Sequence, residues 1–218
     1  MENRFLIVNG HPDPSARRFC AALCDAYAAG VQSCGWRTDR LDAGAVLASL
    51  PRRLQETADL SLSGAAGALS RIRAADLVAI VFPLWLGSAP HALQQMFESI
   101  ATAAEWPRST IAAHLVVTMD MPAFLYRPRS RTASEARSQF YLQGVRACEV
   151  TLIGGVNVIS QEDRERRLVE MQAIAASVVE RNMSARRRSV FGWRLPATFF
   201  GRPPDPVSRH VAGALPQH

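Results

Sequence analysis

The sequence predicts an α/β protein with a doubly wound, five-stranded parallel sheet and helices on both faces. Two observations support this fold class. Short runs of consecutive apolar residues, such as Leu77–Phe82, alternate along the chain with amphipathic stretches. Such runs are typical of strands that are covered on both faces, because a half-exposed strand alternates apolar and polar residues. Parallel neighbours also need a crossover connection, which a helix between successive strands provides.

The first half of the chain begins with an apolar run and continues into a helical pattern. Ser15 is the predicted N-cap of a helix that reaches about Ser33, with one apolar residue every four positions. Residues 42–66 show no clear pattern and are left unassigned. The predicted elements of this half are strand Arg4–Asn9, helix 15–33, strand Trp36–Leu41, helix Ala68–Ala75 and strand Leu77–Phe82.

The second half repeats the same alternation and ends in a long helix. That helix opens with a capping box at Ser160–Asp163 and runs to about Asn182 along an apolar face that includes Leu168, Met171 and Val178. The other predicted elements are helix Ala89–Ala104, strand Ile111–Thr118, a loop over 119–132, a helix near 133–147 and strand Val150–Gly154.

The 218 residues suit one domain of this kind, over residues 1–182, followed by a basic and aromatic arm or tail over 183–218. The tail has six arginines, one aspartate and five prolines, so it carries most of the net charge of +6. It could contact an anionic membrane surface, but its dense aromatic residues favour packing against a partner subunit. No nucleic-acid partner is expected.

Residue types that are missing exclude several classes of chemistry. Every basic residue other than histidine is arginine, and the absence of lysine excludes a Walker A site and a Schiff base. The four cysteines form no C-x-x-C pair, so we interpret them as small buried residues. The apolar N-terminal run is too short for a signal peptide, and no run approaches the roughly 20 residues of a membrane span. These features predict a cytoplasmic protein.

Three loops follow strands at the sheet edge where proteins of this class bind ligands. The first loop, residues 9–19, leads into a helix N-terminus and carries four donors, His11, Ser15, Arg17 and Arg18. A helix N-terminus favours anions, so this loop is a candidate phosphate cradle. The alternative is an ordinary surface loop with solvated arginines.

The second and third loops, residues 83–90 and 118–127, are unusually apolar. Trp85 stands in the second, and Phe124 and Tyr126 stand in the third. Each loop by itself could simply pack against a neighbouring element or subunit. Together, the three loops suit a ligand with a phosphate at one end and a planar ring at the other. FMN is such a ligand.

On these residues the chain resembles the NAD(P)H:quinone oxidoreductase family of flavodoxin-like flavoproteins. The resemblance rests on Asn9–Ser15 with Phe19 behind it, on Phe82–Trp85, and on Leu115–Thr118, and it extends over roughly residues 4–180. It implies the strand order 2-1-3-4-5 and FMN as cofactor, with FAD as the alternative. It also implies NAD(P)H as hydride donor, a quinone-like acceptor and a homodimer.

The resemblance also implies roles for individual residues. The phosphate end of the flavin would contact His11, Ser15, Arg17, Arg18 and Phe19. The isoalloxazine would lie against Pro83, Leu84, Trp85 and Leu86, and its polar edge would meet backbone groups of Thr118, Met119, Asp120, Met121 and Pro122. Tyr126 would face the substrate as the catalytic residue.

The chain departs from the family at Met119-Asp120, where relatives often carry glycine, and at Cys20, where many have asparagine. It also lacks a histidine between Arg127 and Arg146, where relatives often place one beside the active site. Two alternatives to an NAD(P)H oxidoreductase therefore stay open. One is a flavodoxin-like electron carrier, and the other is a non-catalytic regulatory or accessory subunit that keeps the fold.

Overall fold

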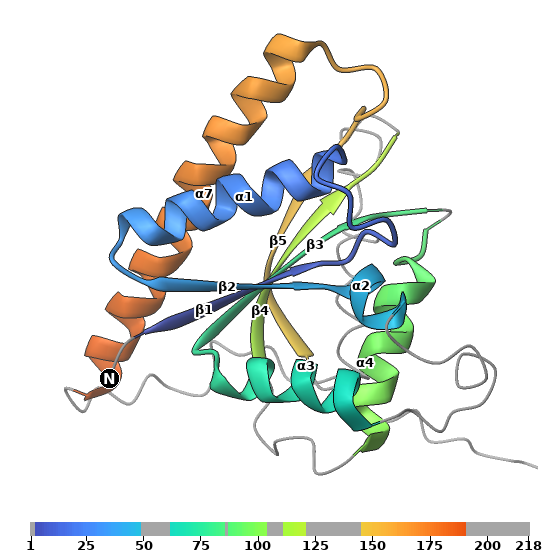
Figure 1. The fold of residues 1–218 in the computed structure, drawn as a ribbon. Coiled ribbons are helices and arrows are strands. Elements are labelled where there is room, and N and C mark those ends of the chain that lie inside the picture. Colours follow the sequence, from blue (N-terminus) through green and yellow to red (C-terminus); the bar gives the residue numbers. More distant parts are fainter. Residues whose placement is uncertain (1–2, 49–61, 86, 104–110, 121–144, 191–218) are drawn as a thin grey trace, which may run out of the picture. The chain divides into compact units, whose positions relative to one another are not determined.

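A computed structural model describes residues 3–48, 62–85, 87–103, 111–120 and 145–190. Its five strands form one parallel sheet in the order β2-β1-β3-β4-β5 (Figure 1). This arrangement confirms the predicted fold class and strand order. The strands are β1 (Arg4–Asn9), β2 (Arg37–Asp42), β3 (Leu77–Pro83), β4 (Ile111–Thr118) and β5 (Val145–Ile153).

Helices cover both faces of this sheet. Figure 1 shows α1 and α7 on one face and α2, α3 and α4 on the other. The close approach of α1 and α7 depends on Gly30, because a Cβ atom there would lie 2.2 Å from the backbone oxygen of Gln172. The helices are α1 (Phe19–Ser33), α2 (Ala43–Ala48), α3 (Leu62–Ala74), α4 (His91–Ala103) and α7 (Gln161–Val190).

The chain divides into two compact units, Met1–Arg181 and Asn182–His218. The first contains the whole sheet. The described part of the second is the end of α7, which continues eight residues beyond its predicted end at Asn182. Arginine has a high helix propensity, so Arg186–Arg188 favour this extension. The rest of the predicted tail lies outside the described residues. None of the described helices combines the length and apolar character that crossing a bilayer requires.

The predicted start of the first helix was wrong. Helix α1 begins at Phe19 with Arg18 as its N-cap, and no side chain caps it. Ser15 instead belongs to a preceding turn, because its amide donates to Asp13 Oδ1 (2.9 Å) and its hydroxyl accepts from the Arg17 amide (3.3 Å). A serine therefore stabilises the loop here and leaves the first turn of α1 uncapped.

The fifth strand also differs from its prediction. It begins at Val145, whereas the sequence pattern placed its start at residue 150 and a helix near 133–147. Ala113 pairs with Ala147 and His114 with Glu149, so β5 has an irregularity around Cys148 that interrupts the strand pattern. The remainder of the predicted helix, residues 133–144, lies outside the described residues.

Helix α2 occupies part of the unassigned segment 42–66. It fits there because Gly44 lies against the first loop, where a Cβ atom would stand only 2.0 Å from the Pro12 carbonyl oxygen. Helix α3 begins at Leu62, six residues before its predicted start. The short helix α2 therefore supports the loop that follows β1.

Candidate functional site

Backbone hydrogen bonds hold the loops after β1, β3 and β4 at one edge of the sheet. The Gly10 amide donates to the Val81 oxygen (2.8 Å), and the Leu84 amide donates to the Thr118 oxygen (2.7 Å). The Met119 amide donates to the Ile153 oxygen (2.9 Å), so the end of β5 joins the same edge. The three loops singled out from the sequence therefore start side by side.

Glycine is required where the first loop leaves β1. A Cβ atom at position 10 would lie 2.6 Å from Leu93 Cδ2 and 2.8 Å from Phe82 Cβ. Any side chain would therefore displace α4 or β3. Gly10 lets the loop turn tightly over the end of β3, which brings His11 towards the second loop.

Asn9 fixes the course of this loop from within the core. Its side chain is fully buried; its amide donates to Asp42 Oδ1 (2.7 Å), and its carbonyl oxygen accepts from the His11 amide (3.2 Å). Asp42 ends β2, so these bonds tie the ends of two strands to the loop. Sequence reasoning did not assign Asn9 or Asp42 to the site; their signal is a polar residue at the end of each strand.

His11 connects the first loop to the second. Its Nδ1 lies 3.0 Å from the Asp13 amide nitrogen and 2.9 Å from the Asp13 oxygen, so Nδ1 has a partner in either protonation state. The ring meets Trp85 edge to face, with the ring centroids 5.9 Å apart. Burial lowers the pKa of His11 and the backbone oxygen of Asp13 opposes this shift, so the ring is neutral at pH 7. No described residue bonds Nε2, which is free to meet a ligand.

The two arginines of the first loop have different surroundings. Arg18 Nε donates to Asp13 Oδ2 at 2.7 Å, and the hydrogen bond from the Ser15 amide, followed by this pair, lowers the pKa of the Asp13 carboxyl group. The Arg17 side chain is exposed and forms no ion pair with any described residue. Arg17 is therefore the cation of this loop that an anionic ligand would meet first.

The N-terminus of α1 lies next to these groups. Its first turn has no side-chain cap. The Ala21 and Ala22 amides donate to the Arg18 oxygen (3.0 and 3.2 Å), whereas the Phe19 and Cys20 amides bond no described residue and, with the positive end of the helix dipole, can meet an acceptor. The ring of Phe19 is covered by the Arg164 guanidinium of α7, 5.5 Å from its centroid. One face of the Phe19 ring is therefore covered by Arg164. Arg164 was not identified from the sequence, which shows no pattern that links it to this loop.

The second loop exposes an aromatic ring. Trp85 and Ser88 bond each other through both backbone amides (3.0 and 2.9 Å), and Gly87 has the positive φ of +82° that this tight turn requires. Pro83 and Leu84 are buried, whereas Trp85 is 48% exposed. Trp85 is therefore the apolar surface that this part of the loop offers. Leu86, a predicted flavin contact, lies outside the described residues.

Only the beginning of the third loop is described. Thr118 is buried, with its Oγ1 3.5 Å from Cys20 Sγ on α1, and burial raises the pKa of the Cys20 thiol. Met119 is buried too. Its amide donates to the Ile153 oxygen, and its own oxygen accepts from the Val156 amide. Its backbone is therefore engaged within the fold, whereas Asp120 is exposed. The predicted contacts Met121 and Pro122 and the predicted catalytic Tyr126 lie outside the described residues.

These features fit a ligand with an anionic end and a flat apolar end. The uncapped helix N-terminus, Arg17 and His11 Nε2 form the polar half. Trp85 forms the apolar half, and it touches the polar half through the His11 ring. A flavin mononucleotide combines a phosphate with a planar ring system, so the described residues fit its two ends.

Comparison with known proteins agrees with this architecture. A family model described as "Flavodoxin-like fold" matches residues 3–178. Among solved structures, NAD(P)H:quinone oxidoreductase from Methanothermobacter marburgensis is similar with a TM-score of 0.63 and 17% identity, over 82% of this chain and 98% of that one. No curated protein gives a significant match.

Two further similar structures contain FMN. One is an FMN-dependent NADH-azoreductase from Bacillus anthracis, with a TM-score of 0.57 and 13% identity over 81% of this chain and 99% of that one. The other is general stress protein 14 from Treponema denticola, with a TM-score of 0.56 and 14% identity over 82% and 98%. At these identities the similarity establishes the fold.

Proposed function

This chain belongs to the flavodoxin-like fold family, and on that premise we propose that it is an FMN-dependent NAD(P)H oxidoreductase with a quinone-like acceptor. The observation that carries the proposal is the contact between His11 and Trp85, which joins an anion cradle to an exposed aromatic wall. The solved relatives named for NAD(P)H, quinone or FMN support the same assignment. FAD is the alternative cofactor.

The proposal gives each part of the site a task. The Phe19 and Cys20 amides of α1, with Arg17 and Ser15, hold the phosphate, and His11 Nε2 donates a hydrogen bond at its edge. Trp85 covers the ring system, and the loop after β4 borders its polar edge. When bound, FMN supplies the hydride chemistry between NAD(P)H and the acceptor. The protein orients both substrates against the ring and excludes water from it.

Asp120 gives the proposed site an unusual electrostatic feature. Its carboxylate is exposed directly after β4, at the loop expected to border the ring. A negative charge there opposes the accumulation of further negative charge nearby. We therefore expect Asp120→Asn to raise the midpoint potential of the bound flavin. The roles of Pro83, Leu84, Leu86, Met121, Pro122 and Tyr126 remain predictions from the sequence.

The first experiment is an absorption spectrum of the purified protein before and after addition of FMN, followed by NADPH and NADH without air. The proposal expects a flavin spectrum that bleaches with one of the nucleotides and recovers when 1,4-benzoquinone is added. A protein that stays colourless after addition of FMN or FAD contradicts flavin binding. Bound flavin that neither nucleotide bleaches favours the accessory-subunit alternative, and bleaching without steady turnover favours an electron carrier.

A second experiment tests the phosphate cradle. Arg17→Gln is expected to weaken FMN binding by about tenfold while leaving riboflavin binding unchanged, because riboflavin lacks the phosphate. Arg18→Gln is the matched control; its guanidinium is paired with Asp13, so a smaller effect is expected. Fluorescence titration measures both affinities. Equal losses for FMN and riboflavin would show that Arg17 acts on the fold rather than on the phosphate.

Two further parts of the proposal rest on the sequence. The protein is expected to form a homodimer, which sedimentation of the purified chain measures, and to act in the cytoplasm, which cell fractionation tests. Removal of residues 184–218 should weaken the dimer if the tail packs on the partner subunit.

A further inference from the structure

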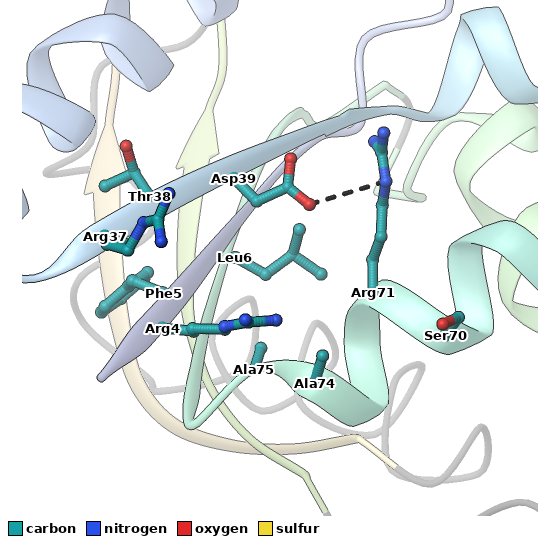
Figure 2. Close-up of a pocket in the computed structure, with 10 residues that line it drawn as sticks. All are labelled: Arg4, Phe5, Leu6, Arg37, Thr38, Asp39, Ser70, Arg71, Ala74 and Ala75. Atoms are coloured by element: carbon teal, nitrogen blue, oxygen red, sulfur yellow. Dashed lines mark ion pairs between the residues drawn. The ribbon is translucent and has the colours of Figure 1, made fainter. Parts of the chain in front are cut away.

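A second concave site lies at the opposite end of the sheet. It is a cavity of about 410 Å³ between the amino ends of β1 and β2 and the last turns of α3 (Figure 2). Cavities of this size accept small organic molecules. The residues that line it are Arg4, Phe5, Leu6, Arg37, Thr38, Asp39, Ser70, Arg71, Ala74 and Ala75.

The sheet register places two arginines on the same side of the cavity. Arg4 pairs with Arg37 in neighbouring strands, and Leu6 pairs with Asp39. Register partners in a parallel sheet point to the same face, and Leu6 belongs to the core cluster that packs against α3. Both arginines therefore face the side that α3 covers. Helix α3 adds a third arginine, Arg71, from across the cavity.

The arginines differ in how they are held. Arg71 is fixed by an ion pair with Asp39 (Nε to Oδ2, 3.5 Å) and by a hydrogen bond from Nη1 to the Arg40 oxygen (3.0 Å). Arg4 extends from β1 towards α3, as Figure 2 shows, and its guanidinium forms no ion pair with a described residue. The lining thus holds one cation in place and leaves another available. The lining contains three arginines and one carboxylate, and the Asp76 carboxylate, which accepts from the Arg4 amide (3.0 Å), lies outside it.

We propose that this cavity binds a small organic phosphate. A phosphate monoester carries nearly two negative charges at pH 7, which suit a lining with more arginines than carboxylates. Arginine offers paired N–H donors that suit phosphate oxygens, and Ser70 of α3 is also among the lining residues. The methyl and methylene groups of Leu6, Ala74 and Ala75 provide an apolar surface for the organic part of the ligand.

The proposed phosphate site is separate from the flavin site. Arg4 begins β1 and Asn9 ends it. At roughly 3.3 Å per residue, the two ends of this strand are about 17 Å apart. A ligand at Arg4 therefore does not touch the loop at residues 10–18, and the phosphate site does not depend on the proposed oxidoreductase activity.

The test is an NMR titration of the full chain with phenyl phosphate, in the presence and absence of saturating FMN. We expect amide shifts at residues 4–6, 37–39 and 70–75 that FMN does not abolish. Shifts confined to residues 10–18 would overturn the proposal, because they would place the phosphate in the flavin cradle. Succinate is the comparison dianion. Binding of succinate as tight as that of phenyl phosphate would overturn the assignment to phosphates.

Matched variants test the arginines themselves. Arg4→Gln is expected to weaken phenyl phosphate binding by about tenfold, since it removes one charge-assisted contact. Arg73→Gln, on the same helix as Arg71 but outside the cavity lining, is expected to change the affinity by less than about twofold. Arg71→Gln gives an independent test from α3. Equal affinities for Arg4→Gln, Arg71→Gln and the unchanged chain would refute the site.

Discussion

The two faces of the sheet are built in different ways. The face under α3 and α4 is an apolar cluster that includes Leu6, Val8, Leu115 and Val117. The residues that alternate with them face α1 and α7, and they include the buried polar residues of the described chain, which are Asn9, His114 and Thr118.

Each buried polar group on the α1 and α7 side has a defined partner. His114 Nδ1 meets the Tyr27 hydroxyl and its Nε2 meets Thr151 Oγ1, both at 2.9 Å. Thr118 meets Cys20 on α1, as described above. Apolar contacts tolerate small shifts, whereas a buried hydrogen bond is lost when its partner moves. Both faces bury apolar side chains, but among the described residues the face under α1 and α7 adds these buried hydrogen bonds, which fix where α1, and hence the first turn of the site, is placed.

The largest expected effect on stability is in the apolar cluster under α3 and α4. Phe82→Ala removes a fully buried ring from the cluster and is expected to lower the free energy of unfolding by about 3–5 kcal/mol. Denaturant unfolding measures this loss. Trp85→Ala is the control, three residues away but 48% exposed, with an expected cost below about 1 kcal/mol. Similar losses for both variants would contradict the placement of Phe82 in the buried apolar cluster.

The second effect distinguishes the face under α1 and α7 by the pH dependence of its stability. Burial lowers the pKa of His114 to about 4, while the charges of Glu149 and Arg181 oppose each other. The unfolded chain, with an ordinary histidine pKa near 6.5, therefore holds more protons than the folded chain between pH 6.5 and 4. Stability should fall by about 1–3 kcal/mol as the pH drops through this window.

Urea unfolding at several pH values measures the contribution of His114. His114→Gln cannot titrate, so its stability should change less over the same window than that of the unchanged chain. A His114→Gln profile parallel to that of the unchanged chain would assign the acid sensitivity to other groups.

The smallest effect concerns a surface ion pair at the margin of the face under α1 and α7. Arg181 bonds both carboxylate oxygens of Glu149 (2.9 and 2.8 Å), but both side chains are about half exposed. Arg181→Gln is therefore expected to cost less than about 1 kcal/mol, and less in high salt. Thermal unfolding at low and high salt checks this. A loss above that of Phe82→Ala would mean that the surface ion pair, and not the core, holds α7 to the sheet.

The sequence predicted the sheet well because its strands are unusually regular. Arg4–Asn9 and Ile111–Thr118 agree with the structure, since unbroken apolar runs have few other uses in a chain of this class. The wrong predictions concern where two elements begin, which depends on contacts with residues that the local pattern does not show. Ser15 has the chemistry of an N-cap, but Asp13 and Arg17 draw it into a turn. The start of β5 is obscured by an irregularity that only pairing with β4 reveals.

The candidate site divides in the same way. The positions of the three loops were predictable, because they follow apolar strands at the edge where the chain order reverses. The pairing of Arg18 with Asp13, the contact of Arg164 with Phe19 and the bond from Asn9 to Asp42 were not. Each joins side chains whose meeting depends on rotamers and on elements brought together from a distance.

The sequence by itself determined the fold class and, through a family resemblance, the strand order, and it predicted the edge of the sheet at which a ligand binds. The fold class and the positions of the loops follow from local apolar patterns, which depend on neighbouring residues alone. Only the tertiary structure decided that Arg17 is the arginine of the first loop without a described ion pair and that Trp85 is exposed. It also brought Arg4, Arg37 and Arg71 together around a second cavity. Charge pairing is a short-range interaction between residues distant in the chain, so it is settled when the strands and helices come together.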